Sequence, residues 1–368
     1  MQEFLFQLLR IGLQTRTPVD EDLSALQRFK RDDWESLFEI AKHQSVAAIV
    51  YDGVESIISI LGKGFFDLCG DISFWDSFLD SWKEYSREYY VAGNMKQLAV
   101  IADIQERWAQ CGIKMMLMKG MAMGYYYSVP KYRCPGDIDC YLFDDYARGN
   151  EIAKTFASKV DERWYKHSQI KYADELIENH RFFVHTREGR SSKALERILV
   201  NTLDTKDFDT LPGTGALLPP PMFNALFLTY HALTHFLEEG LRLKQLLDWA
   251  MFLDKNADEI DWSEFYSICE KYHMRRFAEV ATDVAVNYLG VKLENTQVVT
   301  SSPFTTRVLE STFNDKDYVF SSGEGGWKNR LHIVRNLWKY RWKYYQIYQH
   351  SVIRQLWYYV TGFLFKTE

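Results

Sequence analysis

The chain has 368 residues, of which 47% are hydrophobic and 16% aromatic, and this composition excludes an intrinsically disordered protein. The formal net charge of −6 is unevenly spread, because residues 327–368 carry eight Lys or Arg against one acid and are therefore +7, which leaves residues 1–326 at −13. Five scattered cysteines without a Cys-x-x-Cys pair argue against a disulfide framework or a zinc ribbon and favour a reducing compartment.

The start of the chain predicts a helix instead of a targeting signal. Residues 1–5 are partly apolar but are accompanied by no basic segment and no small-residue cleavage site, as a signal peptide would require. No run in the sequence reaches the roughly 18 apolar residues that a transmembrane helix needs. With the cysteine pattern, these features predict a cytoplasmic protein without a transmembrane segment.

Residues 1–110 are predicted to be helical almost throughout. Residues 32–41 carry acids in the first turn and apolar residues at helical spacing, and Ser45 opens a second such run. Between residues 73 and 110 only Gly93 interrupts the pattern, so one or two long helices should lead into the first strand. We assign the aromatic residues on this stretch to the core, because they recur at a spacing of three to four: Phe74, Phe78, Trp82, Tyr85 and Tyr89.

The first strand is predicted at the apolar run 114–118, which turns at Lys119 and Gly120 into a helix through residues 123–127. A helix start favours a phosphate, since free backbone N–H groups and the helix dipole both attract an anion. Gly120 would allow close approach, and Lys119 would add a full positive charge. A simple turn after a strand is the alternative for the same two residues.

A second strand carries two carboxylates. In the stretch 136–142, Asp137 and Asp139 alternate with Ile138, Cys140 and Leu142, so one face of the strand is acidic and the other apolar. Two carboxylates one strand repeat apart repel each other unless a cation lies in front of them, and oxygen ligands of this kind suit a hard divalent ion. We predict magnesium.

These residues resemble those of a known family. Lys119 and Gly120, then Arg133, then Asp137 and Asp139, are similar to the uncharacterised nucleotidyltransferase family of the DNA polymerase β-like superfamily. The resemblance covers most of the chain. It implies a third carboxylate on a later strand. Within residues 175–183, an acid two positions before a histidine matches this pattern, so the resemblance makes Glu178 the third metal ligand and His180 its neighbour.

Other residues near this strand leave alternatives open. Asp174 and Glu175 are close enough to compete with Glu178, because a slip of one residue turns a side chain to the opposite face. On the approach to the strand, Lys166, His167 and Lys171 could contact phosphate or be solvated charges.

The segment 211–221 is rich in Gly and Pro and predicts a linker or the edge of a lid. Helices are predicted after it at residues 222–236, 241–253, 262–272, 275–289 and 305–313, with Asp261 as an N-cap and Glu264 three positions later.

Within this region, His231 and His235 lie four apart on one helical face, a spacing that can bind zinc, but Ala232 replaces the Glu of a zinc peptidase. The family resemblance matches His231, His235, Arg242 and Asp248 to paired histidines followed by a basic residue and an Asp. A role near a nucleotide and an interhelical hydrogen-bond network both remain open for the histidines.

The C-terminal tail combines its positive charge with many aromatic residues. Such a helix could lie on an anionic membrane, on nucleic acid or on the acidic body of its own chain. We favour the last, because the aromatic residues occur on every face, and we expect a joint at Gly323, Gly325 and Gly326. The aromatic residues concerned are Trp338, Tyr340, Trp342, Tyr344, Tyr345, Tyr348, Trp357, Tyr358 and Tyr359.

We therefore predict an α+β fold. A small mixed-sheet nucleotidyltransferase-like core at residues 111–210 is inserted between two mainly helical regions. The first comprises residues 1–110, and the second comprises residues 211–368 and ends in the basic aromatic tail. The resemblance implies a magnesium-dependent transferase that moves a nucleoside monophosphate from a nucleoside triphosphate to a hydroxyl and releases pyrophosphate. Asp137, Asp139 and Glu178 would hold two Mg²⁺ ions about 3.5–4 Å apart. The nucleotide would contact Lys119, Gly120, Arg133, His180, His231 and His235.

Two alternatives concern the reaction and its acceptor. The turn has Lys-Gly where the superfamily usually has Gly-Ser, and the gap to the acids is long, so a catalytically inactive nucleotide-sensing or protein-interaction module is the second hypothesis. The acceptor of an active enzyme could be a small molecule, a sugar or a protein. Nucleic acid is less favoured because only the tail is basic.

Overall fold

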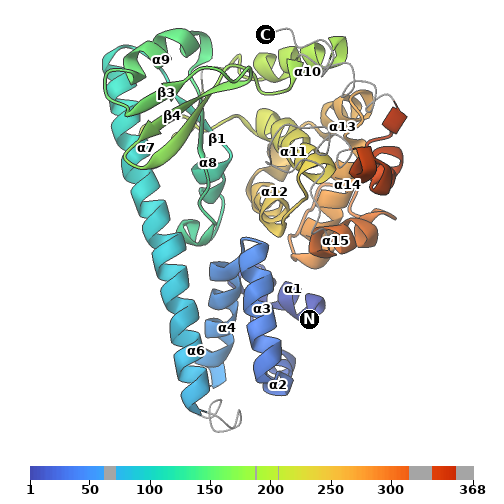
Figure 1. Ribbon diagram of the computed structural model, residues 1–368. Helices are drawn as coiled ribbons and strands as arrows, with labels where there is room; N and C mark the ends of the chain where they lie inside the picture. The colour runs from blue at the N-terminus through green and yellow to red at the C-terminus, as the bar shows by residue number, and fades with distance from the viewer. Residues whose placement is uncertain (62–71, 187–188, 206, 315–333, 354–368) are drawn as a thin grey trace.

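The computed structural model describes residues 1–61, 72–186, 189–205, 207–314 and 334–353, which form a small mixed sheet surrounded by helices (Figure 1). The predicted α+β class is confirmed. The strands that the structure describes all lie between residues 116 and 180, with helices before and after them in the sequence. The domain boundaries at 110 and 210 stay predictions.

The N-terminal helices form a cluster of their own at the bottom of Figure 1. They pack through apolar faces, and Trp34, Leu37 and Ala41 are the buried residues of the third helix. Tyr90 Oη accepts a hydrogen bond from the Ala47 N–H at 3.1 Å, and Trp82 donates to the Ala47 carbonyl at 3.0 Å. The helices are α1 (Gln2–Gly12), α2 (Asp20–Arg28), α3 (Arg31–His43) and α4 (Ala47–Leu61).

A long helical rod joins this cluster to the sheet. It consists of α6 (Ile72–Tyr85), a π-helical stretch at Ser86–Ala92 and α7 (Gly93–Gln110), and it runs along one side of the molecule (Figure 1). Gly93 keeps helical angles, so it does not break the rod. Of the predicted aromatic core on this rod, Trp82 is buried and Phe78 and Tyr85 are half-buried, whereas Tyr89 is exposed; the side chain of Phe74 lies outside the described residues.

The sheet has the order β1-β2-β5-β4-β3, and β2 and β5 are its parallel pair. On one face, Ser168 and Asn179 hydrogen-bond to Asn150 of α9 (Tyr146–Ala153). Asp145 precedes α9 and forms no side-chain cap. The strands are β1 (Met116–Met118), β2 (Ile138–Tyr141), β3 (Lys159–Asp161), β4 (His167–Tyr172) and β5 (Glu175–His180).

The Gly- and Pro-rich segment 211–221 is attached to the free edge of β1. Leu217 donates to the Met115 carbonyl and accepts from the Leu117 N–H, each at 2.9 Å, and Leu211, Ala216 and Leu218 are buried. The predicted linker or lid edge is therefore fixed to the sheet along part of its length, because unpaired backbone groups at a sheet edge can pair with an extended segment that lies beside them.

The second helical region lies beside the sheet (Figure 1). Its predicted helices are present with small shifts at their ends, and Asp261 caps its helix by accepting from the Glu264 N–H at 2.9 Å, as predicted. A helix that was not predicted, α10 (Arg190–Asn201), precedes this region. The helices of the region are α11 (Pro221–Glu238), α12 (Leu243–Asn256), α13 (Trp262–Lys271), α14 (Arg275–Asp283), which continues as a π-helical stretch at Val284–Tyr288, and α15 (Thr305–Asn314).

The described part of the tail, residues 334–353, packs against this region. Lys343, Tyr344 and Ile347 of a π-helical turn are buried, and the Lys343 ammonium donates to the Phe236 carbonyl of α11 at 3.0 Å. This part of the tail therefore covers its own chain, although Trp338 and Tyr345 are exposed. Gly323, Gly325, Gly326, Trp357, Tyr358 and Tyr359 lie outside the described residues. Among the helices that the structure describes, none is long and apolar enough to cross a membrane.

Candidate functional site

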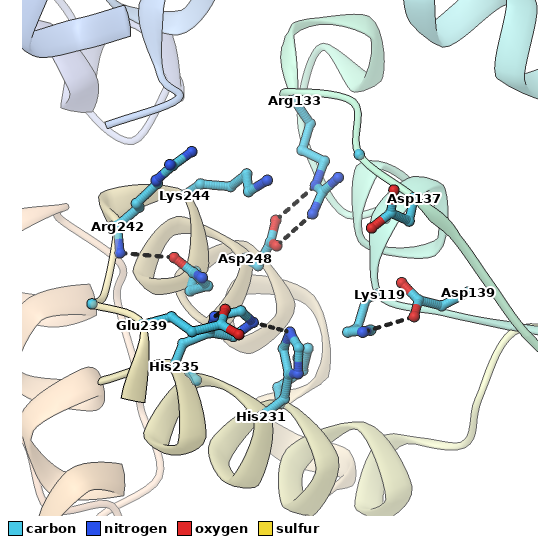
Figure 2. A pocket seen from close by; sticks show the side chains of 16 residues that line it. Lys119, Arg133, Asp137, Asp139, His231, His235, Glu239, Arg242, Lys244 and Asp248 are labelled. Atoms are coloured by element: carbon cyan, nitrogen blue, oxygen red, sulfur yellow. Dashed lines mark hydrogen bonds and ion pairs between the residues drawn. The ribbon is translucent and has the colours of Figure 1, made fainter. Parts of the chain in front are cut away.

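A pocket of about 320 Å³ opens between the sheet and helices α11 and α12 (Figure 2). We call its two sides the sheet wall and the helical wall. The sheet wall consists of Lys119, Gly120, Arg133, Gly136, Asp137 and Asp139. The helical wall consists of Leu228, His231, Ala232, His235, Glu239, Gly240, Arg242, Lys244, Gln245 and Asp248. Segments at least 89 positions apart in the sequence, the separation of Asp139 and Leu228, thus face one another across a single cavity.

Strand pairing brings the predicted carboxylates together. Asp139 lies opposite Glu178 in the parallel β2–β5 pair, and residues at matched positions of adjacent strands project to the same face. Asp137 precedes β2, is exposed, and lines the same pocket as Asp139. Glu178 lies beside Asp139 on the sheet, outside the residues that line the pocket. The structure therefore places all three predicted carboxylates in one neighbourhood.

Asp139 is a buried carboxylate with two nitrogen partners. Its Oδ1 lies 2.8 Å from Lys119 Nζ and 2.8 Å from His180 Nε2, and only 6% of the residue is exposed. Burial alone would raise the pKa of Asp139, but the Lys119 charge and the His180 hydrogen bond hold the pKa below its ordinary value. Asp139 is thus held as an anion at the edge of the pocket.

Asp137 has the opposite electrostatic environment. Its pKa is raised by partial burial and by the negative charges of Glu178 and Asp139, which outweigh the positive charges of Lys119 and Lys244. Among the described residues, no ion pair or hydrogen bond is formed by its carboxylate. Asp137 therefore offers the pocket a carboxylate that a cation would stabilise.

The turn between β1 and the following helix has an unusual backbone. Lys119 has φ 49° and ψ −152°, and Gly120 has φ 44°. A Cβ on Gly120 would lie 3.1 Å from the Asp137 carbonyl oxygen, so glycine is required for both the angle and the space. The helix that follows, α8 (Gly120–Gly124), has five residues and ends earlier than predicted. Positive charge at this turn therefore comes chiefly from the Lys119 side chain, because so short a helix has little dipole.

Arg133 joins the two walls of the pocket. Its Nε and Nη2 donate to the two carboxylate oxygens of Asp248 at 3.1 and 2.9 Å, and Nη1 donates to the Cys134 carbonyl at 2.8 Å. Tyr127 also donates to Asp248, at 2.8 Å. Burial would lower the pKa of Arg133, but the Asp248 charge raises it. All three guanidinium nitrogens are engaged within the protein, so Arg133, which we predicted to contact the nucleotide, is held in place by Asp248.

The two histidines of α11 form a short chain of polar contacts. His231 Nε2 lies 3.1 Å from His235 Nε2, and His235 Nδ1 lies 2.9 Å from Glu239 Oε2. Both histidines line the pocket and face the sheet wall (Figure 2). Burial and the charge of Lys119 keep the pKa of His231 well below its ordinary value, which favours a neutral imidazole. The contacts run along one helix, which corrects the alternative of an interhelical network.

A second cluster adjoins Asp139 on the sheet. The His167 ring on β4 lies opposite His180 on β5, with His167 Nε2 3.3 Å from Glu178 Oε1 and His180 Nε2 3.6 Å from Glu178 Oε2. Burial alone would raise the pKa of Glu178, but the hydrogen bond from His180 and the contacts with both histidines hold the pKa below its ordinary value. Nearby, burial lowers the pKa of Lys166 to about 8, so Lys166 is not the simple solvated charge that we considered.

Three residues of these clusters were absent from the predicted site, and each had a signal. Glu239 follows His235 by four positions on the same helix. Lys244 comes two positions after Arg242, and burial lowers its pKa. His167 is placed opposite His180 by a two-residue hairpin at Ala173 and Asp174, both with positive φ, a type of turn that fixes the register of the strands.

One comparison with known proteins returned a match. A family model described as "Uncharacterised nucleotidyltransferase" matches residues 30–290, which is more than half of the chain and includes both walls of the pocket. No curated protein and no solved structure matches the chain.

Proposed function

Because the chain belongs to the uncharacterised nucleotidyltransferase family, we propose that it transfers a nucleoside monophosphate from a nucleoside triphosphate to a hydroxyl acceptor. The acceptor oxygen forms a bond to the α-phosphorus, the bond between the α-phosphorus and the bridging oxygen to the β-phosphorus breaks, and pyrophosphate leaves. The acceptor hydroxyl loses its proton in the same process.

The observation that supports this proposal best is the distribution of charge in the pocket. Asp137 and Asp139 lie on the sheet wall with Lys119, and Arg242 and Lys244 lie on the helical wall with Glu239, while Arg133 and Asp248 pair with each other. A metal-bound triphosphate matches this arrangement, because the cation is attracted to the carboxylates and the phosphate oxygens to the basic groups. Lys244 has no acidic partner among the described residues, so its charge is available to phosphate.

The donor set of Asp137 and Asp139 fits a hard divalent cation such as Mg²⁺, since it consists of carboxylate oxygens and Asp137 lacks a compensating partner. When bound, such ions would polarise the phosphoryl oxygens and stabilise the developing charge. With Glu178 beside Asp139, we propose that these three carboxylates bind two ions.

The chain's own residues position the substrate. Lys119 would move from Asp139 to a phosphate oxygen once a cation neutralises the carboxylate, and Lys244 would contact the far phosphates. Gly120 allows close approach to the backbone. We assign Arg133 to positioning, because its pairing with Asp248 fixes the distance between the two walls.

We propose that the acceptor is a hydroxyl of a small molecule, a sugar or a protein. The charge of −13 over residues 1–326 opposes binding of a nucleic acid, which requires a basic footprint.

A second candidate function, nucleotide binding without turnover, is supported by one observation. Asp139 already shares its Oδ1 between Lys119 and His180 at 2.8 Å each, and these partners would compete with a cation for the carboxylate. Such a protein would act as a nucleotide-sensing or interaction module.

Calorimetric titration with ATP, CTP, GTP and UTP, with and without Mg²⁺, tests the proposal when released pyrophosphate is assayed in parallel with candidate acceptors. We expect Mg²⁺-dependent binding and pyrophosphate release, and we expect Asp139→Asn to lower the transfer rate by about three orders of magnitude or more, since it removes a ligand shared by both ions. Binding without pyrophosphate release would support the module, and an Asp139→Asn variant with full activity would refute the assignment of the site.

A further inference from the structure

Four side chains with metal-binding atoms share one face of three adjacent strands. His167 pairs with His180 across the antiparallel β4–β5 ladder, and Asp139 pairs with Glu178 across β2–β5. Glu178 and His180 are two residues apart on β5 and therefore project to the same side. Strand pairing, and not a flexible loop, thus fixes the relative positions of two imidazoles and two carboxylates.

The distances among three of these side chains suit a single ion. One ligand atom from each of His167, Glu178 and His180 lies within 4.8 Å of the others, and the shortest separations are 3.3 Å from His167 Nε2 and 3.6 Å from His180 Nε2 to Glu178. Ligands at about 2.0–2.2 Å from an ion, at tetrahedral or octahedral angles, are about 3.0–3.5 Å apart. In the part of the chain that the structure describes, no other three His, Cys, Asp or Glu meet this criterion.

The orientation of His180 is that of a metal ligand. Its Nδ1 lies 3.3 Å from the Phe182 carbonyl oxygen, to which an Nδ1–H would donate, and its Nε2 is directed at Asp139 and Glu178, where binding of an ion would release the Nε2 proton. A backbone carbonyl that holds one ring nitrogen in this way is typical of metal-binding histidines. His180 is 1% exposed, so the surrounding core prevents the ring from turning away.

We propose that His167, Glu178 and His180, with Asp139 as a fourth ligand, form a binding site for a divalent transition-metal ion such as Mn²⁺ or Zn²⁺. The existence of this site does not depend on the proposed function. Its assignment as the second of two metal positions of the transferase rests on that function. Imidazole nitrogen favours transition metals over Mg²⁺, whereas the oxygen donors of Asp137 and Asp139 suit Mg²⁺. The two positions would share Asp139 and select different ions.

The site can be reached from solvent. The side chains of His167 and Glu178 are 18% and 16% exposed, while those of His180 and Asp139 are buried. An ion would therefore bind on two fixed, buried ligands and be closed off by two partly exposed ones.

Mn²⁺ binding to the full chain, measured without nucleotide, tests the proposal. Electron paramagnetic resonance titration gives the affinity, and the spin-echo modulation from coordinated nitrogen reports imidazole ligands directly. We expect nitrogen modulation in the wild type and a loss of affinity of more than about tenfold in His167→Gln, since removing even an outer-shell partner of a metal ligand typically costs 10–100-fold. Glu178→Gln should lower the affinity to a similar degree.

His235→Gln is the matched control, because His235 is also a partly exposed histidine near a carboxylate and lines the neighbouring pocket. It should leave Mn²⁺ affinity and nitrogen modulation unchanged. Circular dichroism melts of the metal-free variants identify any that fail to fold, and Glu178→Gln, which keeps the size of the side chain, then replaces His167→Gln as the deciding variant. Absence of nitrogen modulation in the wild type, or an equal loss in His235→Gln, would overturn the proposal.

The absence of this metal site can be distinguished from the absence of nucleotidyl transfer. Nitrogen-ligated Mn²⁺ in a protein that releases no pyrophosphate would support the metal site and count against transfer. Mg²⁺-dependent transfer by a protein without nitrogen-ligated Mn²⁺ would support transfer and exclude the metal site.

Discussion

Two ion pairs line the same pocket and are built differently. Lys119 and Asp139 belong to one wall, their contact is a single one at 2.8 Å, and Asp139 Oδ1 also contacts His180. Arg133 and Asp248 come from opposite walls, form two hydrogen bonds at 3.1 and 2.9 Å, and are both buried. Tyr127 adds a third hydrogen bond to Asp248.

The difference indicates which ion pair can take part in ligand binding and which one holds the two walls in position. A single contact to a shared oxygen can be exchanged for a cation or a phosphate without leaving other groups unpaired. A bidentate pair in which every guanidinium nitrogen is engaged cannot be exchanged in this way, because breaking it leaves a buried charge without a partner. We therefore expect Lys119 and Asp139 to rearrange when a ligand binds, and Arg133 and Asp248 to stay in place.

Breaking the pair between the walls should have the largest effect on stability. Arg133→Met leaves the Asp248 carboxylate buried without its cation, which typically costs about 3–5 kcal/mol. Urea denaturation measures the loss in the free energy of unfolding. Adding Asp248→Asn to the same chain should recover at least half of it, since the unpaired charge is then removed; a double variant as unstable as the single one would contradict this explanation.

His185 should make a pH-dependent contribution to the free energy of unfolding. Its backbone N–H donates to Tyr230 of α11 at 3.3 Å, so His185 also links the sheet side to the helical side. Burial, followed by the charges of Lys166 and His167, lowers the pKa of His185 from 6.5 to about 4. Between these values the unfolded chain binds a proton that the folded protein does not, so stability present above pH 6.5 is lost as the pH falls towards 4.

The loss should be about 2–3 kcal/mol, because each pKa unit corresponds to about 1.4 kcal/mol and the ring is not fully buried. Denaturation curves of wild type and His185→Asn at pH 7 and pH 4.5 measure it. The variant should show the smaller decrease on acidification; equal decreases in the two proteins would rule out His185 as the source.

Breaking the pair within the sheet wall should cost less than breaking the pair between the walls. Lys119→Met leaves Asp139 with its His180 contact, so we expect a loss of about 1–2 kcal/mol in the free energy of unfolding, together with weaker binding of Mg²⁺–nucleotide in a titration. A loss in stability larger than that of Arg133→Met would reverse the distinction between the two pairs.

The smallest effect is expected on the helical wall at Glu239, whose side chain is 59% exposed. Glu239→Gln removes the charge that contacts His235, and exposed pairs of this kind contribute little, so stability should change by less than about 0.5 kcal/mol. Thermal melts measure the change. A larger loss would show that the chain of contacts from Glu239 to His231 stabilises α11.

Much of the local structure could be predicted from the sequence alone. The helices after residue 221 follow from hydrophobic periodicity and from the Asp261 cap, and β2 and β5 follow from short alternating patterns around Asp139 and Glu178. These features depend on residues close together in the chain, whose geometry is set by the helix and strand repeats. The same repeats placed Asp137 and Asp139 together before any tertiary contact was known.

Only the tertiary structure decided which distant residues meet. Arg133 bonds to Asp248 instead of pointing freely into the pocket, His231 and His235 face Asp139 across the cavity, and Leu217 completes the edge of the sheet. Local patterns contain no information on such contacts, because they depend on how helices and strands pack on one another. The family membership and the acidic strand follow from the sequence by itself, whereas the two walls, and the Arg133–Asp248 pair that joins them, arise from packing between segments far apart in the chain.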